Sequence, residues 1–145
     1  MKIAWLSAAA LVAITACNGP SEDTPSLKAD CEFVLSDPEL SGELAEAATT
    51  PEAACACLEA HIAGDAGKEE KIGLFFHQVA AAMKETGTGA EDTASRLVAQ
   101  SMMPGETPEG TRFADTLPVF NNVFERLMDE IEDGGGACPA VPAPE

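Results

Sequence analysis

The segment ACACLEAH, residues 54–61, carries two cysteines and a histidine in one short stretch of the chain. A Thr-Pro pair at positions 50–51 precedes it, and a hydroxyl followed by proline is typical of a helix start. With a glycine at 64 as the stop, the pattern predicts a helix over residues 50–62. Each residue turns a helix by about 100°, so Cys55 and Cys57 point about 160° apart. The two sulfurs therefore suit two different partners, and a bond between them would distort the helix.

The beginning of the chain indicates export. Lys2 is followed by an apolar run over residues 3–16, and an Asn-Gly-Pro sequence ends the region directly after Cys17. The run is shorter than the roughly twenty apolar residues that a membrane-spanning helix needs. Residues 1–16 are therefore predicted to be a secretory signal peptide.

The end of this run, Ile14-Thr15-Ala16-Cys17, resembles the lipobox of bacterial lipoproteins. The resemblance implies cleavage before Cys17, a diacylglyceryl thioether on its sulfur, and a fatty acid such as palmitate on its new amino group. It also implies a lipid anchor in the cell envelope, with Asn18 favouring the outer membrane on its periplasmic side. Residues 17–25 would then be the lipidated cysteine and a short tether. The alternative is an ordinary signal peptide with Cys17 near the cut by chance.

An even set of cysteines remains if Cys17 is lipidated, and in an exported chain such a set predicts two disulfides. The four are Cys31, Cys55, Cys57 and Cys138. Cys55 lies on the same side of its helix as Leu58, and Cys31 lies on the apolar stripe of the preceding helical segment. We therefore expect a Cys31–Cys55 bridge inside the domain.

Cys57 is expected to face outward, where the Pro-rich tail can bring Cys138 across it. The swapped pairing, Cys31–Cys57 with Cys55–Cys138, is the alternative. In the loop-entropy model the favoured bridges stabilise the fold by about 3 and about 4.5 kcal/mol.

Apolar residues recur every three or four positions along most of the chain, and no segment shows the alternation of a strand. The predicted helices cover residues 26–35, 39–48, 50–62, 68–85, 90–103 and 116–132. The sequence thus predicts an all-α domain over residues 26–133, a small bundle of four longer and one or two short helices. Residues 106–112 are expected to be a loop, and residues 134–145 a Gly- and Pro-rich tail.

Five of the six phenylalanines lie in or beside the two longest predicted helices. They are Phe75, Phe76, Phe113, Phe120 and Phe124. These two helices are expected to pack on each other at the centre of the core, with Pro118 in the first turn of the second helix and Phe124 buried.

The composition excludes some functions. The formal net charge is −17, which would repel nucleic acid. No phosphate-binding loop, nucleophile elbow, zinc-protease or calcium-loop pattern occurs. We therefore expect a non-enzymatic, membrane-anchored binding module with an envelope protein as partner and no cofactor besides the lipid. The acidic runs at 69–70 and 129–133 are candidate contacts, although solvated faces would look the same.

The alternative function is a periplasmic copper- or zinc-binding protein. Cys57 and His61 are four residues apart and share a helix face, which is good ligand spacing. Further ligands could come from Cys138, Glu59 or Asp65, and Met102 with Met103 could serve Cu(I), although adjacent methionines usually pack in a core. His77 is expected to flank the core rather than to bind metal. An enzyme with paired carboxylates is a third possibility, but with 25 acidic residues no pair stands out.

Overall fold

Six α-helices and no strand make up the part of the chain that the computed structural model describes, residues 26–103 and 108–141. In α6 the side chains are described from Phe113 onward. The helices are α1 (Leu27–Leu35), α2 (Pro38–Glu46), α3 (Pro51–Ile62), α4 (Ala66–Thr86), α5 (Ala90–Ser101) and α6 (Pro108–Asp133). The prediction of an all-α domain with four longer and one or two short helices is confirmed, with two short helices observed. The predicted signal peptide, Cys17 and the whole predicted tether lie outside the described residues.

The first four helices begin at side chains that cap their free N–H groups. The capping residues are Ser26, Asp37, Thr50 and Asp65. The cap at Asp65 starts α4 two residues earlier than predicted, because its Oδ1 accepts a hydrogen bond from the Lys68 N–H at 3.1 Å. Lys68 also places its Nζ 3.0 Å from Oδ2. These hydrogen bonds from Lys68 hold the pKa of the Asp65 carboxyl below its usual value.

The start of α6 was predicted wrongly. The helix begins at Pro108, so the expected loop at 106–112 is mostly helical and Pro118 lies inside the helix. A proline in a helix interior costs about 3 kcal/mol. Phe113, which the longer helix carries into the core, is fully buried, and burying such a side chain contributes about 1.5–3 kcal/mol. The cost of the internal proline and the gain from burying Phe113 are of similar size. The position of the proline alone therefore does not predict where the helix begins.

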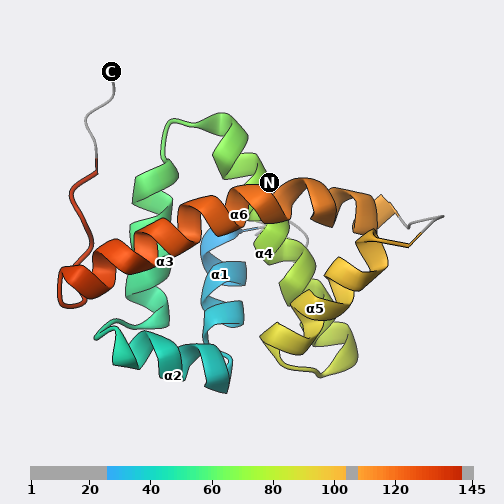
Figure 1. Ribbon diagram of the computed structural model, residues 1–145, viewed down its shortest axis with the longest axis horizontal. Helices are drawn as coiled ribbons and strands as arrows, with labels where there is room; N and C mark the ends of the chain where they lie inside the picture. Colours follow the sequence, from blue (N-terminus) through green and yellow to red (C-terminus); the bar gives the residue numbers. More distant parts are fainter. Residues whose placement is uncertain (1–25, 104–107, 142–145) are drawn as a thin grey trace, which may run out of the picture.

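Helix α4 lies at the centre of the domain and packs mainly on α1 and α6. In Figure 1, α6 crosses the width of the view in front of α3 and α4, and α2 lies at the lower edge. The rings of Phe75 on α4 and Phe120 on α6 stack with their centroids 3.8 Å apart. Phe76 is fully buried beside them. The expectation that the two phenylalanine-rich helices pack together is confirmed.

Phe124 departs from its expected place. It stacks on Phe120 with a centroid distance of 5.0 Å, but it is only half-buried and lines a surface groove. The aromatic row on α6 thus starts in the core and ends at the surface. In the described ranges no helix is both long and apolar enough to cross a membrane.

Candidate functional site

Helix α3 carries both disulfides. Cys31 on α1 pairs with Cys55, with Cα atoms 5.9 Å apart, and Cys57 pairs with Cys138, with Cα atoms 5.6 Å apart. The predicted pairing is confirmed. Cys57 was expected to face outward, yet only 3% of it is exposed, because the tail that carries Cys138 lies over it. Both sides of α3 are therefore covered, one by α1 and the other by the C-terminal tail.

Besides the Cys57–Cys138 bridge, a second contact holds the tail directly after α6. Gly136 has φ +89° and donates its N–H to the Ile131 carbonyl at 2.8 Å, which reverses the chain at the helix end. Its α-carbon lies so close to Ala48 that an added Cβ would collide with the Ala48 carbonyl oxygen. Ala48 follows α2, so this contact joins the C-terminal ends of α2 and α6.

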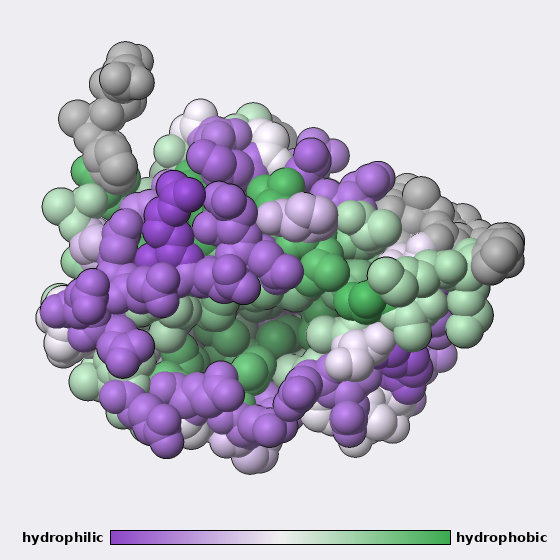
Figure 2. Space-filling model, in the orientation of Figure 1, coloured by the Kyte–Doolittle hydropathy of each residue, from purple (hydrophilic) through white to green (hydrophobic). Residues whose placement is uncertain are grey.

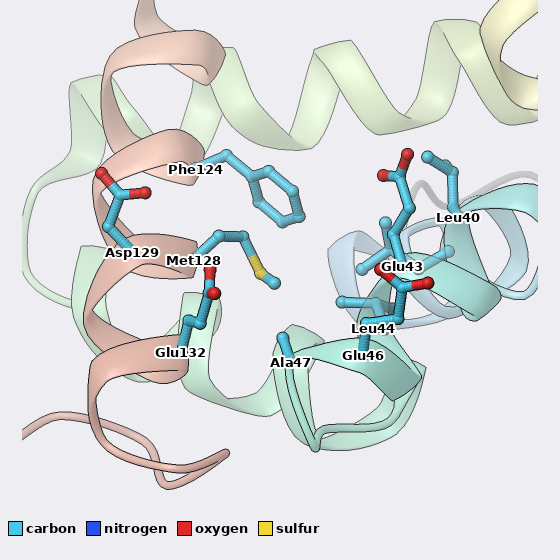
Figure 3. Close-up of a pocket in the computed structure, with 10 residues that line it drawn as sticks. Leu40, Glu43, Leu44, Glu46, Ala47, Phe124, Met128, Asp129 and Glu132 are labelled. Atoms are coloured by element: carbon cyan, nitrogen blue, oxygen red, sulfur yellow. The ribbon is translucent and has the colours of Figure 1, made fainter.

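A groove of about 400 Å³ opens between α2 and α6 from this junction. Its apolar floor and walls consist of Leu35, Leu40, Leu44, Ala47, Phe124 and Met128. Figure 2 shows this apolar hollow between two hydrophilic ridges, and Figure 3 shows the Phe124 and Met128 side chains directed toward α2. Leu35 and Leu44 are nearly buried, whereas Leu40, Phe124 and Met128 are half-buried. The uncovered apolar surface is therefore shared by the two walls. We call this site the acidic groove.

Carboxylates form the rim of the acidic groove on both sides. Glu43 and Glu46 lie on the α2 wall, and Asp129 and Glu132 on the α6 wall. No basic residue lines the groove, and none of the four carboxylates forms an ion pair with a described residue. Such a site repels anions and attracts cationic groups over an apolar floor.

Away from the groove, Asp30 has two basic partners. Asp30 on α1 is nearly buried, and its Oδ2 lies 3.0 Å from the His77 Nδ1 while its Oδ1 lies 3.8 Å from the Lys84 Nζ. These contacts join α1 to α4. His77 therefore flanks the core, as expected, and contributes to packing between helices. The sequence did not predict that Asp30 is buried. Its only indication was the position of Asp30 next to Cys31, which lies on the buried side of α1.

The metal alternative loses its predicted ligand pair. The Cys57 sulfur is in a disulfide and is not available as the thiolate that a metal ion would bind. No group of three or more His, Cys, Asp or Glu residues in the described part could hold a metal ion. Met102 and Met103 are exposed at the end of α5 rather than packed in a core, at 79% and 60%.

Comparison of the chain with protein-family models, with curated proteins and with solved structures found no match. The acidic run at 129–133 had been singled out in the sequence as a candidate contact, and two of its members line the groove. Glu43 and Glu46 were not predicted as contacts, because the sequence does not reveal that α2 faces α6. The α2 wall could have been found only from the pattern of α2 itself. Leu40 and Leu44 are four residues apart, with acidic residues between and after them.

The junction at the end of the groove can be tested by Gly136→Ala, with Gly135→Ala as the matched control. Both residues have positive φ, which costs an alanine about 1–2 kcal/mol. Only Gly136 would also collide with backbone, a strain of typically about 1–3 kcal/mol. Chemical denaturation should therefore show a larger loss of unfolding free energy for Gly136→Ala. Equal losses would mean that Gly136 does not hold α6 against Ala48.

Proposed function

We propose that this protein is a membrane-anchored lipoprotein of the bacterial envelope, and that its helical domain is a non-enzymatic binding module for an envelope protein. The observation that carries the binding role is the acidic groove. It combines a partly uncovered apolar floor with carboxylates on both walls, and this combination supports a role in binding. Its lining residues include no histidine, cysteine, serine or threonine, so the groove offers no Ser–His or Cys–His pair for nucleophilic catalysis.

The anchor rests on the lipobox resemblance at Cys17. Two or more acyl chains hold a protein stably at a membrane, since each buried methylene contributes about 0.8 kcal/mol. The tether would join the domain at the start of α1, near Leu27. Leu35, at the other end of α1, lines the acidic groove about 12 Å along the helix axis. The groove is thus at the end of α1 away from the tether, where a partner in the periplasm can reach it.

The experiment places a photoreactive amino acid in the full-length chain, expressed in a bacterial host, and analyses envelopes after irradiation. At Met128, in the groove, it should give a discrete crosslinked protein. At Ala99, an exposed position on α5, it should give little. Cys17→Ser in the same chain should abolish the fatty acid found by mass spectrometry and release the domain from the membrane fraction.

The two arms can fail separately. Fatty acid and membrane fractionation that persist in Cys17→Ser would refute the anchor. Crosslinks that are absent at Met128, or equal at Met128 and Ala99, would refute the groove as the binding surface.

A further inference from the structure

We infer that the occupant of the acidic groove is an amphipathic α-helix of a partner protein, with lysine or arginine on both flanks of a narrow apolar stripe. This inference rests on the proposed function, which leaves the chemistry of the partner open. It follows from three features of the groove: the spacing of its apolar residues, the spacing of its carboxylates, and the way its walls are held apart.

The apolar residues favour a helical partner. Leu40 and Leu44 are four residues apart on α2, and Phe124 and Met128 are four residues apart on α6. Each wall therefore presents two side chains stacked one turn apart. Two such walls form the kind of hole into which the side chains of a third helix pack. An added strand would need a free strand edge, and the described residues form none.

The rim specifies the charge of that helix. Glu43 and Glu46 are one turn apart on one wall, and Asp129 and Glu132 are one turn apart on the other. The Cβ atoms of two residues one turn apart on a helix lie about 5–6 Å from each other. A helix whose apolar stripe has basic residues one turn apart on each flank can meet all four carboxylates. These are the positions at which charged residues select partners in coiled coils.

The same charges exclude other occupants. A second copy of this chain is strongly acidic, with 25 acidic and 8 basic residues, so two copies would repel each other through this groove. An anionic lipid surface is repelled for the same reason. The volume of about 400 Å³ accommodates a few side chains of a partner rather than a whole helix, so the partner would lie along the groove and insert its stripe.

The groove is held open before anything binds. The Gly136–Ala48 contact and the Cys57–Cys138 bridge fix one end of the groove. Carboxylates line both walls, and their like charges oppose closure of the groove. A basic partner would remove this repulsion as it covers the floor. The same groups that keep the site open thus favour the partner that fills it.

The test uses the lipidated mature protein in micelles of an uncharged detergent and a synthetic helix of about 18 residues. The helix carries a leucine stripe with one photoreactive leucine, and lysines on both flanks. One control peptide replaces the lysines with glutamates, and a second has the same composition in scrambled order. Crosslinking to the protein is the readout, since binding to micelles alone gives no protein adduct.

The lysine peptide should crosslink to α2 and α6 at residues of the groove, and more weakly as salt is added. For the double variant Glu43→Lys with Glu132→Lys, the peptide concentration at half-maximal crosslinking should rise about tenfold. The matched control is Glu85→Lys with Glu130→Lys, which changes the net charge equally. Glu85 lies on α4, and Glu130 projects about 160° away from Glu132 on α6. The control variant should raise the peptide concentration at half-maximal crosslinking much less. Circular dichroism verifies the fold of each variant.

The inference is overturned if the glutamate peptide or the scrambled peptide crosslinks as well as the lysine peptide, or if the two double variants behave alike. It is also overturned if Met128 captures a partner in envelopes while the lysine peptide gives no groove adduct. In that last case the groove would remain the binding surface and only the class of occupant would be wrong. Failure of the envelope crosslink itself would instead remove the proposed function.

Discussion

The two cysteines of α3 impose the constraint on which the rest of the domain depends. Because they are two residues apart on a helix, their sulfurs leave α3 on opposite sides. Cys55 holds α1 against one side, and Cys57 holds the C-terminal tail against the other. Bridges closing loops of this size stabilise a domain by about 3–4.5 kcal/mol each in the loop-entropy model. That is a large share of the 5–15 kcal/mol typical of a whole domain.

The second bridge also determines where the groove lies. It brings residue 138 back to α3, so the end of α6 must lie beside the α2–α3 connection, where Gly136 meets Ala48. Helices α2 and α6 are then held together at their C-terminal ends, while the half-buried Phe124 and Met128 face α2 along the opening between them. A short helix that packs little on the core thereby becomes one wall of a site.

Much of this arrangement could be predicted from the sequence because it depends on local rules. The start of α3 at Thr50, the opposed cysteines and the pairing of the two phenylalanine-rich helices follow from caps and periodicity. The start of α6 does not, because the burial of Phe113 competes with the cost of an internal proline. The groove needed the structure, since the contact between α2 and α6 depends on the close approach of Gly136 to Ala48, which no local pattern in the sequence reveals.

Contacts between distant parts of the chain also explain why the burial of Phe124 and Cys57 was predicted wrongly. Phe124 continues the aromatic row that starts in the core at Phe113, and periodicity alone does not show where the covering helices stop. Cys57 lies on the polar side of α3 in the sequence pattern, yet the tail buries it. Both side chains lie where a distant part of the chain decides their exposure.

Disulfide mapping of the mature protein under non-reducing conditions tests the central claim most directly. Only Ala56 separates the two α3 cysteines, so the bridges must be assigned by tandem mass spectrometry that cleaves disulfides in the gas phase. The account predicts that Cys31 is joined to Cys55 and Cys57 to Cys138, with no free thiol among the four. A Cys55–Cys57 bridge, the swapped pairing, or free thiols at these positions would contradict it.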